Sequence, residues 1–196
     1  MEEILGIRQF WFGDDPDDER TDKRQAGLWW SKDAGVDRQI RQQFENTLLA
    51  VERGDLSHWD ESPEGLSALI LLTDQFSRNM YRGTARAFAF DALALAFCRL
   101  AIEREFDLAM RPIERVFMHM PLVHSESLAD QQQAVQLARA LTTPGQQNCF
   151  TGFLDFAIQH HDIIARFGRY PHRNLILGRP SSAEELAFLQ QPGSSF

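Results

Sequence analysis

The sequence predicts an all-α protein, and three observations lead to that class. No stretch of its 196 residues keeps the apolar–polar alternation that marks a half-buried strand. Apolar residues recur instead at helical spacing, and the Asn-Gly and Asp-Gly pairs typical of tight hairpins are absent. Helix start and stop signals separate about eight such segments with short connections. We therefore expect about eight helices, packed as antiparallel pairs in a single helical domain over residues 1–196.

The first part of the chain divides into three helical segments. Residues 4–12 form a short amphipathic start, and the charged stretch GDDPDDERTDKR that follows predicts a solvated turn. Apolar residues at helical spacing then predict a helix over 36–51, with Gly54 as its stop signal. Ser62 followed by Pro63 has the form of an N-cap and a first-turn proline, so the next helix runs through LSALILLTDQF.

The middle of the chain continues the helical pattern. Thr84 precedes an apolar helix that extends to about Arg104. Pro112 predicts the start of a short helix that ends near Pro121, because proline interrupts a helix interior. A serine of HSES then caps a helix over LADQQQAVQLARAL.

Two further helices complete the pattern. Apolar periodicity predicts a helix over 150–167, closed by Gly168. Ser181 and Glu184 stand at the spacing of a capping box, which predicts the start of the last helix.

Charge and composition narrow the classes of function. The net charge of −8 argues against a nucleic-acid binder and against a protein of anionic membranes. The start MEEILG lacks the basic segment of a secretory signal, and the longest apolar stretch, residues 85–101, contains three charged side chains. We therefore expect a cytoplasmic protein without membrane spans. Cys98 and Cys149 stand outside any CxxC pattern, which predicts buried free thiols.

A first polar cluster follows the apolar run LSALILL. Asp74 and Arg78 are spaced i, i+4 and so lie on one side of the helix, with Asn79 and Arg82 just beyond. A buried carboxylate requires partners, because leaving it unpaired costs several kcal/mol. Asp74 is therefore either a clamp to a neighbouring helix or, with its polar neighbours, part of a pocket wall.

A second polar cluster lies in HMPLVHSESLADQ. His119 and His124 are five residues apart with a proline between them, so they do not share a regular helical face. His124 and Glu126 stand at a helix entrance. They form either a base and its orienting carboxylate or a structural histidine beside a helix cap, and the cap interpretation is favoured.

A third polar cluster, RFGRYPHRN, concentrates positive charge in an acidic protein. Gly168 ends the preceding helix and places Arg169, His172, Arg173 and Asn174 around a turn, after Arg166 in the helix itself. Arginine suits bidentate recognition of carboxylate or phosphate, so three explanations stay open. The arginines form internal clamps, a small-anion pocket or a contact with an acidic partner.

The familiar metal and nucleotide motifs are absent. His160 and His161 are adjacent and point about 100° apart on a helix, so they do not reach one ion together. HExxH, zinc-type Cys/His spacing, the phosphate-binding loop, the dinucleotide glycine pattern and GxSxG are all missing. We expect no metal and no cofactor.

These clusters support three hypotheses. The leading one is a cytosolic helical protein with an Arg/His-lined site for a small anionic ligand or acidic peptide. The second is a hydrolase-like enzyme in which His124 or His161 is the base, Glu126 or Asp162 orients it, and arginines hold an anionic substrate. The third is an interaction scaffold with purely structural polar clusters. The ligand-binding candidates are Asp74, Arg78, Asn79, Arg82, His124, Glu126, His161, Arg166, Arg169, His172, Arg173 and Asn174.

Several long segments together resemble a known protein family. QFWFG, GDLSHW, LLTDQFSRNMYRGTARAFAFD, FMHMPLVHSESLADQ and HHDIIARFGRYPHRNLILGRPSSAEELAFL are similar to the bacterial family called domain of unknown function 924. The resemblance covers nearly the whole chain and implies a fold like the right-handed tetratricopeptide superhelices. It brings no established activity, ligand or catalytic residue.

Overall fold

The protein is helical throughout the part that the structure describes. The computed structural model describes residues 1–142 and 148–195, and these residues contain no strand, which confirms the predicted all-α class. The α-helices are α1 (Glu2–Phe12), α2 (Asp18–Trp30), α3 (Ala34–Arg53), α4 (Pro63–Ile70), α5 (Ser77–Met80), α6 (Asp91–Glu103), α7 (Pro112–His124), α8 (Leu128–Ala140), α9 (Cys149–Phe167) and α10 (Ala183–Leu189). The finer expectation, a tetratricopeptide-like superhelix, stays a prediction.

Short helical segments of other kinds join these α-helices. One is a π-helix, η2 (Leu71–Phe76), which connects α4 to α5 without a break in the chain's helical course. The others are 3-10 turns: η1 (Ser57–Glu61), η3 (Ala85–Phe88), η4 (Asp107–Ala109) and η5 (Pro171–Arg173). None of the described helices combines the length and apolarity needed to cross a bilayer.

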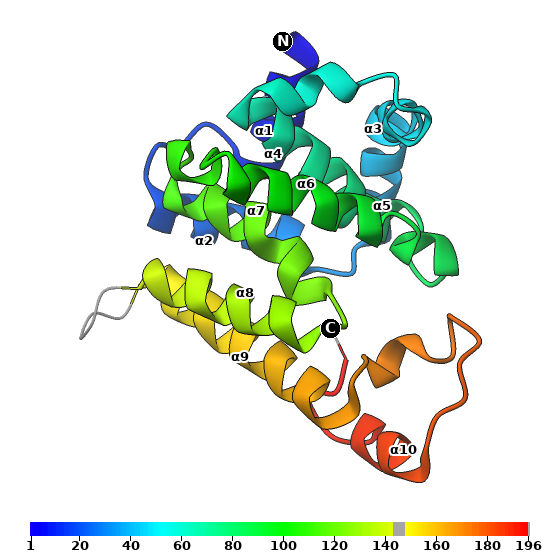
Figure 1. Cartoon of the computed structure of the whole chain (residues 1–196). Coiled ribbons are helices and arrows are strands. Elements are labelled where there is room, and N and C mark those ends of the chain that lie inside the picture. The colour runs from blue at the N-terminus through cyan, green and yellow to red at the C-terminus, as the bar shows by residue number, and fades with distance from the viewer. Residues whose placement is uncertain (143–147, 196) are drawn as a thin grey trace.

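Helix α7 is the centre of the packing. It contacts α2, α4, α6, α8 and α9, and Figure 1 shows it between the α4–α6 layer and the adjacent pair α8 and α9. Its sequence is apolar on nearly every face, which is the pattern of a helix buried on all sides. Residues 116–123 are accordingly buried without interruption. The N-terminal helices and the α8–α9 pair therefore share one element of the core.

Aromatic side chains join α1 and α2 to this central helix. The ring of Phe117 lies 4.6 Å from that of Trp29 and 5.5 Å from that of Trp11, measured between centroids. The indole nitrogen of Trp29 also donates to the carbonyl oxygen of Trp11 at 3.0 Å. This bond satisfies a buried donor that the apolar surroundings would otherwise leave unpaired.

Several predicted helix boundaries are confirmed by their caps. The side chain of Ser62 accepts from the amide of Gly65 at the start of α4, and Ser127 caps α8 in the same way. Gly54 and Gly168 end α3 and α9 in the left-handed conformation, with φ of 80° and 67°.

The sequence predicts a solvated turn for the charged stretch GDDPDDERTDKR, and this prediction is wrong for its second half, which is helical. Asp17 accepts from the amide of Arg20 and thereby caps α2, which includes the second half of the stretch. Acidic residues in the first turn favour the helix because they complement its dipole. Asp15 in turn binds Arg20 at 2.9 Å and Arg24 at 2.8 Å, so the connection is held in place.

Three other boundaries differ from the expectation. Helix α7 continues through Pro121 to His124, because burial on all sides outweighs the one backbone bond that proline removes. The apolar segment after Thr84 begins with the turn η3, so α6 itself starts at Asp91. The last capping box is one residue later than predicted, at Ser182 and Glu185.

The cysteines are both free thiols, but only one matches its expected burial. Cys98 is fully buried in α6. Cys149 is only partly buried at the start of α9, where its amide donates to Glu19.

A close backbone contact at Gly65 provides a test of this packing. A Cβ at this buried position would collide with the carbonyl oxygen of Trp59, so we predict that Gly65→Ala destabilises the protein by about 3 kcal/mol. Gly152 in α9 has no such neighbour, and Gly152→Ala should stabilise the protein by up to about 1 kcal/mol through helix propensity. Urea unfolding measures both changes, and equal effects would contradict the α4–η1 contact.

Candidate functional site

A pocket of about 290 Å³ lies where η2, η3, α6, the end of α7 and the segment after α9 meet. Its polar wall contains Asp74, Asp91, His124, Ser125, Glu126 and Arg173. Its apolar wall contains Phe88, Ala92, Leu95, Pro121 and Leu177. The pocket therefore joins members of all three polar clusters of the sequence to an apolar surface that includes α6.

Asp74 forms the floor of this pocket and is fully buried. Its Oδ1 lies 2.7 Å from Nδ1 of His124 and 3.4 Å from Nη1 of Arg78, and Gln75 donates to its Oδ2 at 2.5 Å. Burial raises the pKa of this carboxyl, but the charges of its partners and these hydrogen bonds outweigh burial and lower the pKa to about 2. Asp74 is therefore a carboxylate at neutral pH.

The local helix geometry places Asp74 where it can reach these partners. It lies within the π-helical segment η2, in which the wider turn changes the direction of the side chains relative to α4. The hydroxyl of Thr73 donates to the carbonyl oxygen of Leu69, and the hydroxyl of Ser77 donates to that of Thr73. These bonds give the backbone carbonyls of the irregular turn an additional donor. A π-turn inside a helix occurs frequently at functional sites.

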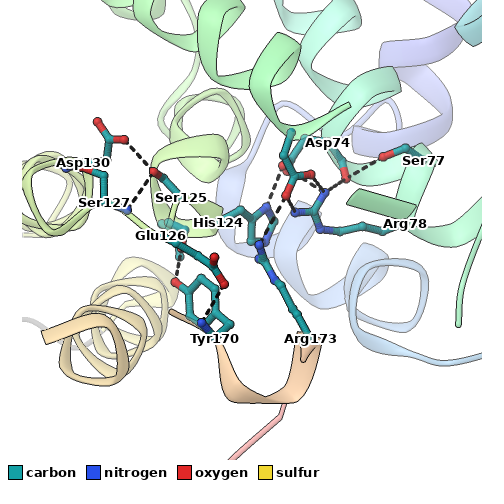
Figure 2. Close-up of polar contacts among 12 residues, drawn as sticks. Asp74, Ser77, Arg78, His124, Ser125, Glu126, Ser127, Asp130, Tyr170 and Arg173 are labelled. Atoms are coloured by element: carbon teal, nitrogen blue, oxygen red, sulfur yellow. Dashed lines mark hydrogen bonds and ion pairs between the residues drawn. The ribbon is translucent and has the colours of Figure 1, made fainter. Parts of the chain in front are cut away.

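His124 is the last residue of α7 and points into the pocket (Figure 2). Because an ionised Asp74 only accepts, Nδ1 of His124 must carry the proton of their 2.7 Å hydrogen bond. Burial and the nearby charge of Arg78 lower the pKa of His124, against the opposing effect of Asp74. The ring is therefore neutral at neutral pH, and Nε2 retains its lone pair.

Asp91 is shared by two arginines. Its carboxylate lies 3.0 Å and 3.2 Å from Nη1 and Nη2 of Arg78, which also donates to the Asp74 carbonyl at 2.8 Å. The contact of Asp91 with Arg173 is longer, 3.4 Å from Nη1 to Oδ2. Asp91 therefore binds chiefly Arg78.

Arg173 is buried at the pocket wall with most of its hydrogen-bonding capacity unused. In the part of the chain that the structure describes, the long bond to Asp91 is the one hydrogen bond of its side chain, and its buried Nε has none. The guanidinium lies over the rings of Tyr170 and Phe88, at 4.4 Å and 4.9 Å from their centroids. Burial and the charge of Arg78 lower its pKa, although an arginine stays protonated.

The other arginines of residues 166–180, called the basic segment from here on, bind glutamates of the protein. Arg169 forms a fork with Glu185 at 2.6 Å and 2.8 Å, and Arg166 binds Glu184 at 2.8 Å, so both attach the segment to α10. Arg179 forms a second fork with Glu126 at 2.7 Å and 2.9 Å. The basic segment is therefore an internal clamp at these three arginines, whereas Arg173 faces the pocket.

Tyr170 fixes the segment against the end of α7. Its backbone amide donates to Glu126 at 2.8 Å, and its buried hydroxyl accepts from Gln131 at 2.8 Å and donates to the Val123 carbonyl (Figure 2). Burial raises the pKa of this hydroxyl, so it stays a donor. These bonds hold the turn that carries Arg173 at a defined distance from His124.

The structure gathers some of the candidate residues and separates the others. Asp74, Arg78, His124 and Arg173 converge in Figure 2, and Glu126 lies at the rim. The other candidates lie outside the pocket. Asn79 and Arg82 bind Asp37. Asn174 binds Ser181 and Arg179, and His161 pairs with the exposed Asp162. The partly buried His172 ring lies 5.5 Å from Tyr170, and burial with the charge of Arg173 lowers its pKa to about 4.

The expected base–carboxylate pairs are wrong in one respect. Glu126 is held by Arg179 and the Tyr170 amide, so it does not orient His124. The carboxylate that does is Asp74, fifty positions away in the sequence. His161 and Asp162 are neighbours on the outer face of α9 and do not border the pocket.

Sequence reasoning missed four contributors to this region. Asp91 and Phe88 come from the segment FAFDALALAF, where a single acid at the start of an apolar helix was the available signal. Tyr170 and Arg179 belong to the basic segment, but local sequence gave no sign of their contacts with α7 and Glu126. Among the described residues, no group of three or more His, Cys, Asp or Glu side chains is arranged to hold a metal ion.

Replacement of Asp74 tests the buried network. Asp74→Ala would strand the charge of Arg78 and remove the partner of His124, so we predict a loss of about 3–5 kcal/mol in the free energy of unfolding. Urea unfolding at neutral pH measures this loss. A change below about 1 kcal/mol would contradict the fully buried placement.

A family model and a solved structure both match nearly the whole chain. The family model for DUF924, described as a bacterial protein of unknown function, matches residues 7–193. The solved structure of a protein of unknown function, ATU0120 from Agrobacterium tumefaciens, is 37% identical, with a TM-score of 0.82 over 95% of this chain and 96% of that chain. No curated protein matches the chain. The protein therefore belongs to the DUF924 family.

Proposed function

We propose that the pocket binds a small organic anion through Arg173. The observation that carries the proposal is the buried guanidinium with unused donors at the pocket wall. A buried charge is costly unless it is paired and hydrogen-bonded, and Arg173 has one long contact where a fork to a carboxylate would use two short ones. A bound carboxylate or phosphate would supply the missing acceptors.

The charges of the pocket favour an anion at Arg173. Arg78 and Arg173 are opposed by Asp74 and Asp91, while Glu126 is neutralised by its own fork with Arg179. Arg78 has two carboxylate partners, Asp91 at 3.0 Å and Asp74 at 3.4 Å, whereas Arg173 has a single contact of 3.4 Å with Asp91 and is the less compensated cation. An anion that accepts from Arg173 would compete only with the 3.4 Å contact to Asp91.

The dimensions and the apolar wall of the pocket support a small ligand with a hydrocarbon part. A volume of about 290 Å³ is at the lower limit for ligand pockets, which favours a small molecule over an acidic peptide. Phe88, Leu95 and Leu177 would contact a hydrocarbon part while the charged group binds Arg173. A small carboxylate or phosphate ester fits both walls.

Anion-dependent stability together with an Arg173 variant tests the proposal. Sulfate and malonate should raise the melting temperature of the wild type more than chloride at equal ionic strength, because they bind only the folded state. Arg173→Met should abolish this difference. In buffer without these anions it should unfold no more easily than the wild type, because it removes a buried charge whose donors are unused.

Two controls make the outcome decisive. Arg169→Lys alters a fork in the same segment but outside the pocket, so it should lower stability and keep the anion response. Asp91→Asn removes the competing carboxylate and should strengthen the anion response. If Arg173→Met instead costs about 3–5 kcal/mol and no anion stabilises the wild type, Arg173 is a structural clamp and the proposal is wrong.

A further inference from the structure

We infer that His124 and Asp74 form a proton-transfer pair whose basicity rises when an anion occupies the Arg173 site. The inference rests on the proposed anion site and adds a chemical step to it. His124 would be the base, and Asp74 its positioning residue. The substrate class is a small organic anion that also carries a proton to lose, or holds a water, beside Nε2 of His124.

The position of His124 suits it to act as a base. Asp74 holds Nδ1–H of His124 at 2.7 Å, which orients the ring and assigns the lone pair to Nε2. His124 and Arg173 border the same pocket, so an anion on the guanidinium lies beside the imidazole. General-base catalysis by a histidine uses three parts. They are a carboxylate that accepts from the ring, a histidine in the matching tautomer and a group that anchors the substrate beside it.

The surrounding charges supply the coupling. The titratable and charged groups around His124 are Asp74 from η2, Arg78 from α5, His160 from α9, and His172 and Arg173 from η5, with Asp91 from α6 and Glu126 beside α8 lining the same pocket. Asp74 favours the imidazolium form of His124, whereas Arg78 and Arg173 oppose it. A bound anion neutralises the repulsion from Arg173 and so makes the ring a stronger base when substrate is present.

The chemical step itself is a single proton transfer in each direction. Nε2 accepts a proton from an O–H or C–H group of the bound anion, or from a water beside it, and the donor keeps the electron pair. The imidazolium that forms is held by the Asp74 carboxylate through Nδ1–H. Nε2–H then returns the proton to the product, and no oxidant, reductant or metal takes part.

The coupling is measurable without knowing the substrate. Nuclear magnetic resonance of isotope-labelled histidine, from about pH 4 to about pH 8, gives the pKa of His124, with His124→Gln to assign the signal. Sulfate is the probe, because it keeps its double charge across this range. Saturating sulfate should raise the His124 pKa by about one pH unit relative to chloride at equal ionic strength.

Reciprocity gives a second readout of the same coupling. If one pH unit separates the two pKa values, sulfate must bind about tenfold more tightly once His124 is protonated. Calorimetric titration should therefore show affinity that rises as pH falls through the His124 pKa. His124→Gln should lose this rise, whereas His161→Gln, which removes a partly buried histidine outside the pocket, should keep it.

The outcomes separate this inference from the anion site itself. Sulfate that binds and raises the His124 pKa supports both. Sulfate that binds through Arg173 but leaves the His124 pKa and the pH dependence unchanged overturns the proton-transfer pair and leaves the anion site intact. Absence of any sulfate binding overturns the anion site, and the proton-transfer pair with it. These measurements are made on the wild-type protein, so they do not depend on the folding of an Asp74 variant.

Discussion

The buried carboxylate of Asp74 determines how Arg78 is paired and, through Arg78, how Asp91 and Arg173 are paired. It lies with no exposed surface in the π-helical turn between α4 and α5, so it must be neutralised by residues of the protein. Arg78 supplies the opposite charge and the neutral ring of His124 donates a hydrogen bond, and these two contacts join the end of α7 to α5. Arg78 also binds Asp91 at 3.0 Å, whereas Arg173 lies 3.4 Å from the same carboxylate. Arg173 is therefore left with one long contact. The open donors of Arg173 are thus a consequence of burying Asp74.

The basic segment combines two roles that its sequence does not distinguish. Arg166, Arg169 and Arg179 bind glutamates, and these forks hold the segment between α10 and the end of α7. They position Arg173 beside His124 without taking part in the pocket. A concentration of arginine in an acidic protein is therefore explained partly by structure, and the residue of functional interest is the one whose bonds are incomplete.

Sequence reasoning succeeded where the physical cause is local. The caps at Ser62 and Ser127 depend on residues within one turn, and the Asp74–Arg78 pair follows from i, i+4 spacing. It failed where distant packing decides. The continuation of α7 through Pro121 depends on burial, and the contact of His124 with Asp74 joins residues fifty positions apart. No local pattern contains that information.

The anion site depends on Arg173, which presents unused donors to the pocket. The most direct measurement is a crystal structure of the protein grown with selenate, whose anomalous scattering identifies the ion. We expect selenate in the pocket, with oxygens about 3 Å from Nε and Nη of Arg173. A pocket without selenate, with Arg173 forked onto both oxygens of Asp91, would contradict it.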